Sequence, residues 1–219
     1  MDCANLNGFN PISTGCQIII GDGLKGTDDI AVPVRGGEYV KEAKIGRAIM
    51  DADVFISLAH FKGHEATGFG GALKNIGMGC GSRAGKMEQH SSGKCVVNEE
   101  LCKGCRKCAK ECGSNAITIA RDISPNCDCH GENDAAILPN IGMFASFDPV
   151  ALDQASADMC LKAEPMPNSQ LSDNLAKPDW EHHHDNFLDS NPNVKWKETL
   201  EHAEKLGMGS REYELIPLK

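Results

Sequence analysis

The fold is first indicated by a short apolar run, Asp53-Val54-Phe55-Ile56-Ser57-Leu58-Ala59. Its length and its β-branched and aromatic residues are typical of a buried strand in a parallel sheet. A polar stretch rich in glycine, histidine and lysine follows directly, from His60 to Asn75. Because α/β proteins place ligands at the carboxyl ends of parallel strands, this order predicts a site immediately after the strand.

Further strands and helices are expected on both sides of this run. Apolar runs predict strands at 16–20, 115–119 and 137–147, and helical periodicity predicts helices at 40–50, 148–159 and 196–206. Asp148 and Pro149 form a start signal for the second helix, and Gly207 forms a stop signal for the third. Residues 164–193 are rich in proline, asparagine and aspartate and are expected to form a loop. The alternation predicts an α/β fold with a partly parallel sheet and flanking helices.

The composition is that of a globular protein with an unusual number of cysteines. The chain has 219 residues, and its net charge of −9 argues against non-specific nucleic-acid binding, which needs clustered lysine and arginine. No apolar run is long enough to span a membrane and no secretory signal opens the chain, so we expect a cytoplasmic protein. Its 11 cysteines are an odd number, which fits a disulfide scaffold poorly and favours metal binding.

Four cysteines form the most specific motif of the chain. They follow the pattern C-x2-C-x2-C-x3-C, at Cys102, Cys105, Cys108 and Cys112. This is the bacterial ferredoxin spacing for a 4Fe–4S cluster, because the short spacers allow one tight loop to place thiolates around a cubane. Zinc is the alternative metal for such a group. We therefore expect a small ferredoxin-like iron–sulfur insertion at 95–130, between the first part of the α/β domain at 1–94 and its return at 131–219.

The identity of the fourth cluster ligand stays open from the residues alone. In two-cluster ferredoxins the fourth cysteine of such a run binds the other cluster. The proline that usually follows that cysteine is replaced here by Gly113. The fourth ligand is therefore either Cys112 or a remote cysteine. The candidates for additional ligands, including those of a second cluster, are Cys80, Cys95, Cys127 and Cys129.

The stretch after the first strand combines histidines and lysines with glycines. The glycines free backbone amides at an expected helix N-terminus, which favours an anion. Lys62 and Lys74 add positive charge, and His60, His64 and His90 are able to bind metal or exchange protons. A solvated turn is the simpler interpretation. Taken together, the residues predict a site whose candidate catalytic residues are His64, Lys74 and His90.

Several strings of the sequence resemble the domain-of-unknown-function 362 family. They are His60-Phe-Lys-Gly-His64, Gly68-Phe-Gly-Gly-Ala-Leu-Lys74-Asn75, Met78-Gly-Cys80, Gly85-Lys-Met-Glu-Gln-His90, Cys127-Asp-Cys129 and Asp148-Pro-Val-Ala-Leu-Asp153. The resemblance implies binding of a 4Fe–4S cluster in a cytoplasmic, often anaerobic microbial setting, whereas the family's activity is largely undefined. Members usually carry a further α/β region before the part matching Gly15, and often a second ferredoxin run. We therefore expect an incomplete sheet.

A shorter stretch is similar to the nickel-pincer lactate racemases. His64, the glycine-rich segment 68–71, Lys74 and His90 keep the spacing of that family. There the lysine tethers the cofactor and the later histidine ligates nickel, so the resemblance implies those roles for Lys74 and His90. We expect a shared loop scaffold that binds an anionic small molecule, rather than the nickel-type cofactor itself.

The remaining polar motifs have simpler interpretations. Asp128 is expected to shape a turn, while Asp148 and Asp153 are expected to cap and solubilise a helix. The run 181–185 contains three histidines but lies in the expected loop, so we interpret it as solvated surface.

Three functions stay open at this point. The first is electron transfer with a redox partner protein, in which a 4Fe–4S cluster passes single electrons to a site near His64 and Lys74. The second is an enzyme, with an oxidoreductase as one candidate, that acts on an anionic small molecule while the cluster is structural. The third is a non-catalytic metal-binding or docking protein.

Overall fold

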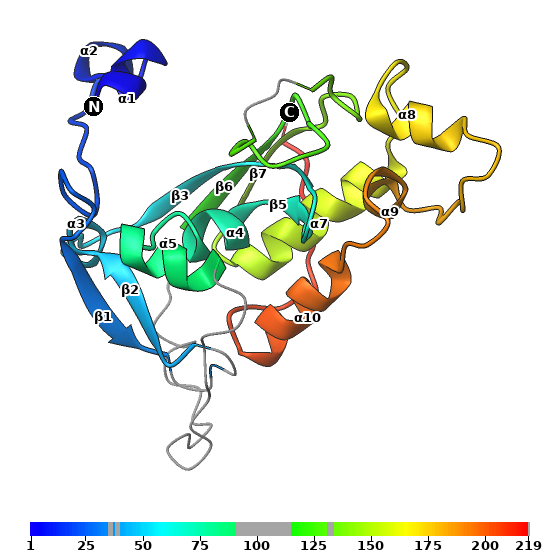
Figure 1. Cartoon of the computed structure of the whole chain (residues 1–219). Coiled ribbons are helices and arrows are strands. Elements are labelled where there is room, and N and C mark those ends of the chain that lie inside the picture. The colour runs from blue at the N-terminus through cyan, green and yellow to red at the C-terminus, as the bar shows by residue number, and fades with distance from the viewer. Residues whose placement is uncertain (35–36, 38–39, 91–114, 131–133, 219) are drawn as a thin grey trace. The chain divides into compact units, whose positions relative to one another are not determined.

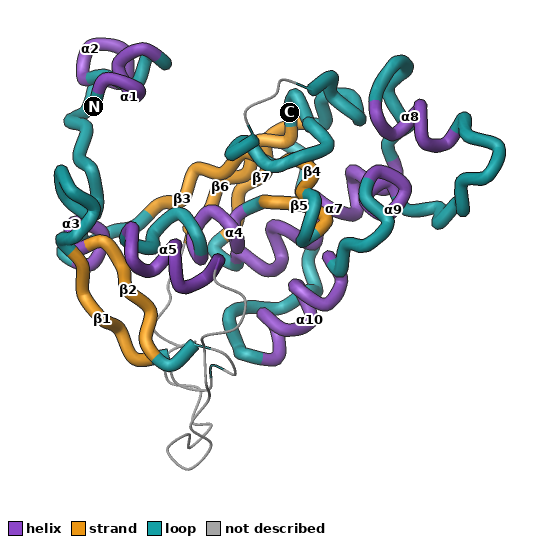
Figure 2. Tube along the Cα trace, in the orientation of Figure 1, coloured by secondary structure: helices purple, strands orange, loops and turns teal. Residues whose placement is uncertain are grey.

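A computed structural model describes residues 1–34, 37, 40–90, 115–130 and 134–218. The chain divides into two units: residues 1–54 with 77–105 form the first, and residues 55–76 with 106–219 form the second. Figures 1 and 2 show the elements of each unit. Among the described residues, no helix combines the length and the apolar character that crossing a membrane requires.

The first unit is built around a two-stranded antiparallel sheet. Strand β1 (Asp29–Pro33) pairs with β2 (Glu42–Gly46), and the short helix α3 (Arg47–Met50) follows directly. The start of helix α5 (Arg83–His90) is held against β2, since Ser82 donates its N–H to the Lys44 carbonyl. The other helices described in this unit are α1 (Asp2–Leu6) and α2 (Pro11–Thr14).

The prediction of a helix at 40–50 is wrong for most of that range. Its centre forms β2, and only the last four residues are helical, as α3. The apolar residues Ala43 and Ile45 fit a period of two as well as a helical stripe, and both pair with β1. Pairing between the two strands therefore overrides the local helical pattern.

The prediction of a strand at 16–20 is also wrong. These residues pair with none of the described strands, and the Ile19 side chain is 74% exposed. The turn expected after them is present, because Gly23, with a φ of 74°, donates its N–H to the Ile20 carbonyl. An apolar run alone cannot form a strand without a neighbouring strand to satisfy its backbone groups.

The second unit contains a three-stranded, partly parallel sheet. Its strands are β3 (Ile56–His60), β6 (Asn115–Ala120) and β7 (Gly142–Ser146), with β6 in the centre. Strand β6 runs parallel to β3 and antiparallel to β7. These pairings confirm the strands expected from the sequence and the partly parallel character of the sheet.

Strand β3 is buried on one face only. Ser57 and Ala59 are buried, whereas Ile56 and Leu58 are 60% and 62% exposed. The strand is therefore less buried than its apolar run predicted. Its carboxyl end still leads directly into the polar stretch, as the sequence indicated.

Helix α7 (Pro149–Lys162) packs on β6 and β7 and confirms the expected helix start (Figure 1). The Asp148 side chain accepts hydrogen bonds from the N–H groups of Val150 and Ala151, and Pro149 occupies the first helical position. These contacts satisfy two of the amides that every helix leaves open at its start.

The expected loop at 164–193 instead contains two short helices. Helix α8 (Gln170–Leu175) begins at the cap Ser169, and α9 (Asn186–Ser190) begins at the cap Asp185. The polar residues that suggested a loop are therefore, in part, helix caps. The run 181–185 follows the expectation only in part, because Glu181, His182 and His184 are exposed whereas Asp185 is buried.

The final helix, α10 (Trp196–Lys205), ends as the sequence predicted. Gly207 adopts a φ of 76° and donates to the Glu204 carbonyl, while Met208 donates to the Ala203 carbonyl. This pair of bonds is a Schellman motif, which closes a helix with a left-handed residue.

A hairpin and an aromatic cluster connect the sheet to these helices. Strand β4 (Lys62–His64) pairs with β5 (Gly68–Gly70) in an antiparallel hairpin. Phe61 and Phe69 stack with ring centroids 4.9 Å apart, and both lie near Phe187 of α9. Trp196 packs on Phe69 and Phe187 and donates its indole N–H to Asp185. The hairpin is therefore anchored by buried aromatic area.

A buried carboxylate joins helix α7 to the start of helix α4 (Ala72–Gly77). The Asp153 oxygens accept hydrogen bonds from the N–H groups of Ala72 at 2.7 Å and Leu73 at 2.8 Å. Asp153 therefore does not solubilise its own helix, which corrects the sequence expectation. Burial raises the pKa of Asp153 to about 7, although the two N–H donors favour the ionised form.

The first prediction concerns Gly71, where a β-carbon would lie 2.2 Å from an Asp153 oxygen. We expect Gly71→Ala to lower the free energy of unfolding by about 2 kcal/mol or more, since the clash displaces the buried carboxylate. Gly77→Ala is the matched control, because nothing lies within 4 Å of the added carbon. The control should be neutral or stabilising in urea denaturation, and equal losses in both variants would contradict the prediction.

The second prediction concerns the pH dependence of stability. Because its pKa is raised from 3.8 to about 7, Asp153 holds a proton in the native state that the unfolded chain releases. Its contribution to stability is therefore fully present below pH 3.8 and is lost as the pH rises towards 7. Relative to Asp153→Asn, the native chain should lose up to about 1.4 kcal/mol per pH unit in this window. If urea denaturation shows that the free energy of unfolding changes with pH equally in the two proteins, the prediction is contradicted.

Candidate functional site

The candidate site begins at the hairpin β4–β5, where His64 shapes the turn. The His64 Nδ1 atom accepts hydrogen bonds from the N–H groups of Ala66 at 3.0 Å and Thr67 at 3.1 Å. Since Nδ1 acts as an acceptor, the proton of the neutral ring lies on Nε2. Burial, together with the charge of Lys74, lowers the pKa of His64. His64 is thus a neutral, turn-forming residue rather than a free base or a metal ligand bound through Nδ1.

A thiol lies opposite this hairpin, in contact with a lysine. The Lys74 Nζ atom, on helix α4, donates a hydrogen bond of 3.1 Å to the Cys127 Sγ atom. Lys74 is positioned by the start of α4, which Asp153 holds in place. The arrangement brings together two residues that are 53 positions apart in the chain.

The segment that carries Cys127 runs along strand β4. Gly63 donates its N–H to the Ser124 carbonyl at 2.7 Å. A β-carbon on Gly63 would lie 2.3 Å from the Pro125 carbonyl oxygen, so only glycine allows this close approach. The contact explains a glycine between Lys62 and His64 without invoking a ligand.

Asp128 is held by the first two basic residues of the polar stretch. One carboxylate oxygen lies 2.9 Å from the Lys62 Nζ atom and 3.0 Å from the His60 Nδ1 atom. Partial burial would raise the pKa of Asp128, but these two hydrogen bonds outweigh it and hold the pKa below its ordinary value. Asp128 thus does more than shape its own turn.

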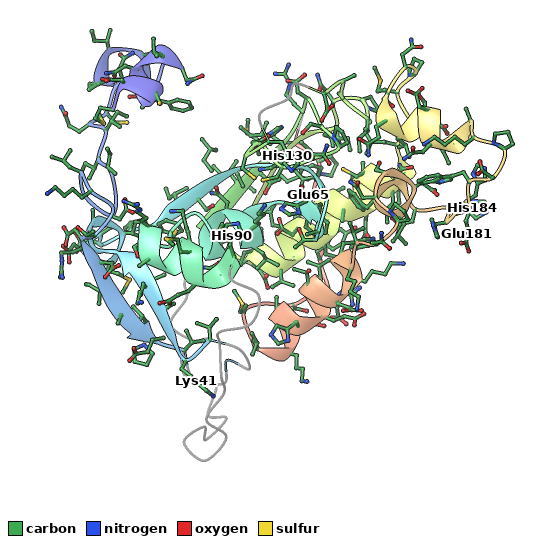
Figure 3. All side chains as sticks on the ribbon, in the orientation of Figure 1. Lys41, Glu65, His90, His130, Glu181 and His184 are labelled. Carbon is green, nitrogen blue, oxygen red and sulfur yellow. The ribbon has the colours of Figure 1, made fainter. Side chains whose placement is uncertain are left out.

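Glu65 supplies a second anchor on the other side of the same segment. Its side chain accepts the Cys127 N–H at 3.3 Å, and it lies 3.3 Å from the His130 Nε2 atom. Figure 3 shows Glu65 and His130 next to each other. The four residues 127–130 are therefore attached to the β4 region by ion pairs and hydrogen bonds on both sides.

These contacts separate the acidities of two neighbouring thiols. Partial burial would raise the pKa of Cys127, but hydrogen bonds from Cys129 and from the Lys74 ammonium outweigh it and lower the pKa. The pKa of Cys129 is raised, chiefly because its thiol donates to Cys127. Cys127 is therefore the thiol of the pair that ionises more readily.

A polar hollow of about 350 Å³ opens beside Cys127. It offers carboxylates, imidazoles and a thiol to a small polar molecule. The residues that line it are His60, Asp122, Ser124, Asn126, Cys127, Asp128, His130 and Asp134.

The structure brings together only part of the predicted site. His64 and Lys74 lie in the second unit, with His60 and Lys62. His90 belongs to the first unit, at the end of α5, where its ring contacts the Lys86 carbonyl at 2.8 Å. Sequence reasoning did not include Glu65 and His130, although both stand next to residues that it selected.

The helix start that was expected to bind an anion is already occupied. The first N–H groups of α4 donate to Asp153, and its lysine, Lys74, contacts Cys127. The other lysine of the stretch, Lys62, is paired with Asp128. The chain's own acidic groups therefore fill the positions that the sequence suggested for an external anion.

The predicted cluster ligands lie mostly beyond the part of the chain that the structure describes. Of the additional candidates, Cys80 belongs to the first unit and Cys127 and Cys129 to the second. Within the described residues, no three histidine, cysteine or acidic side chains gather as a metal site. The predicted ligands outside the described residues are Cys95, Cys102, Cys105, Cys108 and Cys112.

Comparison with known proteins identifies the family but not an activity. A family model described as "Domain of unknown function (DUF362)" matches residues 1–158. The chain belongs to the DUF362 family. The match covers β3, the hairpin, Lys74 and the 127–130 segment, so the site described here lies in the family region. Neither the curated proteins nor the solved structures contain a match to the chain.

The third prediction concerns the protonation of His64. Its imidazole should titrate below the ordinary value of 6.5, because burial and Lys74 disfavour the charged ring. Lys74→Met should move the pKa upward, as followed by NMR of the ring carbons. Lys195→Met, at an exposed lysine, is the control and should leave the pKa of His64 unchanged. A His64 pKa at or above 6.5 in the native chain would contradict this interpretation.

Proposed function

We propose that this DUF362 member binds a 4Fe–4S cluster and takes part in electron transfer with a redox partner protein. The observation that carries the proposal is the C-x2-C-x2-C-x3-C run of Cys102, Cys105, Cys108 and Cys112. When bound, such a cluster supplies single-electron transfer. These four residues would hold it as a small ferredoxin-like insertion.

The described residues support a redox role over the alternative of an enzyme acting on an anionic small molecule. That alternative relied on free amides and free cations near His64 and Lys74. Instead, Asp153 accepts the amides of α4, and Lys74 and Lys62 contact Cys127 and Asp128. Because these amides and lysines already have partners within the chain, they are less available to an external anion.

The positions of the cysteines before and after strand β6 help to identify the fourth ligand of the cluster. Cys112 precedes the amino end of β6, whereas Cys127 and Cys129 follow its carboxyl end. Cys127 also has the Lys74 ammonium as its partner, where a cluster ligand would face iron. We therefore favour Cys112 over Cys127 and Cys129 as the fourth ligand.

The fourth prediction is the metal content of the full chain purified without oxygen. We expect about four irons and four sulfides per chain and a visible absorption that dithionite bleaches. Cys105→Ser should remove most of the iron, while Cys16→Ser, at an exposed thiol of the first unit, should leave it unchanged.

Other outcomes of this experiment would overturn the proposal. A folded, colourless protein without acid-labile sulfide would exclude the cluster, and zinc in place of iron would indicate a structural metal site. A cluster that cannot be reduced, together with a small-molecule thermal shift that Lys74→Ala abolishes, would favour the enzyme.

A further inference from the structure

A second sulfur site lies in the described part of the chain, at a tight turn. The His130 N–H donates to the Cys127 carbonyl at 2.9 Å, which closes a β-turn over residues 127–130. The bend brings Cys127 and Cys129 closer together than the roughly 7 Å of an extended chain. A disulfide spans Cα separations of about 4.4–6.8 Å. The turn therefore places two thiols at a distance that a disulfide can bridge.

The side chains of this turn are arranged unequally. Cys127 is half-buried, accepts a hydrogen bond from Cys129 and lies 3.1 Å from the Lys74 ammonium. Cys129 is exposed, and among the described residues the Lys74 ammonium acts on it through its charge, without the hydrogen bond that it donates to Cys127. An adjacent ammonium stabilises a thiolate both as an attacking group and as a leaving group. The geometry thus distinguishes an attacking sulfur from a second, resolving sulfur.

The turn is held in place by residues that take no part in sulfur chemistry. Asp128, between the two cysteines, is bound by Lys62 and His60, and Glu65 accepts the Cys127 N–H. These contacts fix the backbone on both sides of Cys127 while Cys129 stays at the surface. Cys127 also lines the polar hollow of about 350 Å³, which is open to a small polar molecule.

We propose that Cys127 and Cys129 form a redox-active dithiol that is oxidised to an intramolecular disulfide by a small-molecule disulfide. The Cys127 thiolate attacks one sulfur of the reagent, which forms a mixed disulfide and releases one reagent thiolate. The Cys129 thiolate then attacks Cys127 Sγ and releases the second reagent thiolate. The two cysteine sulfurs lose two electrons, and their two protons go to the two released thiolates.

This proposal does not depend on the cluster of the proposed function. A C-x-C pair also occurs as a metal-binding motif, but no third ligand lies with Cys127 and Cys129 among the described residues. If the pair binds metal, loss of Cys127 should lower the iron content of the chain. If the pair is a dithiol, the iron content should stay the same, so measuring the iron in a Cys127 variant distinguishes the two hypotheses.

The fifth prediction tests the dithiol in the full chain, purified without oxygen and treated with oxidised glutathione. The protein is then denatured, alkylated and digested with trypsin, in that order, because Cys160 is buried in the native chain. Residues 122–162 form one tryptic peptide that contains Cys127, Cys129 and Cys160. We expect this peptide to lose two hydrogens and to keep a single alkylation site, at Cys160. Treatment with dithiothreitol should restore three sites.

Variants identify the role of each residue. Cys129→Ser should stop the reaction at a glutathione adduct on Cys127, because no resolving thiol remains. Lys74→Met should slow disulfide formation by about tenfold, and Lys74→Arg should recover most of the rate, since it keeps the charge. Lys195→Met should react as the native chain does.

Three results would overturn the proposal. The first is a peptide that keeps all three alkylation sites after oxidation, and the second is a disulfide to Cys160. The third is a loss of iron and sulfide in Cys127→Ser that Cys16→Ser does not show, because the turn would then hold the cluster. A rate unaffected by Lys74→Met would overturn the role given to the ammonium.

Discussion

The arrangement of the second unit depends on one buried carboxylate. Asp153 accepts the first two N–H groups of α4 and so joins α7, which packs on the sheet, to the helix that carries Lys74. A buried carboxylate without partners would be strongly destabilising, and these two amides are its partners. Gly71 allows the approach because any side chain there would occupy the same space. The buried Asp153 thus holds the start of α4, the helix that carries Lys74.

Around Cys127 the chain balances its own charges. Lys62 pairs with Asp128, Glu65 with His130, and Lys74 with the Cys127 sulfur. Each pair joins a residue of the 60–74 stretch to a residue of the 127–130 turn. The oxygen and nitrogen groups of these three pairs therefore already have partners within the chain. This pairing supports the proposed redox role over the capture of an external anion.

Local signals in the sequence predicted much of the sheet and several helix ends. The Asp148-Pro149 start and the Gly207 stop depend only on neighbouring residues, and both are present. The helix expected at 40–50 was wrong because its apolar spacing also fits a strand, and pairing with β1 decides between them. The partner of Asp153 could not be predicted, since Ala72 lies 81 positions away. Lys74 was among the predicted site residues, but its contact with Cys127 depends on a loop whose course no local pattern encodes.

The ion pairs around the turn differ in kind from the hydrogen bonds of β6. Strand β6 is bonded along both edges, so its amides open only when the sheet itself comes apart. Residues 127–130 are held by partly exposed charges, whose attraction dissolved ions screen over about 10 Å at moderate ionic strength. The turn can therefore detach while the strand before it stays intact. Added salt should therefore weaken the contacts that hold Cys127 in place, whereas Cys129 already faces solvent.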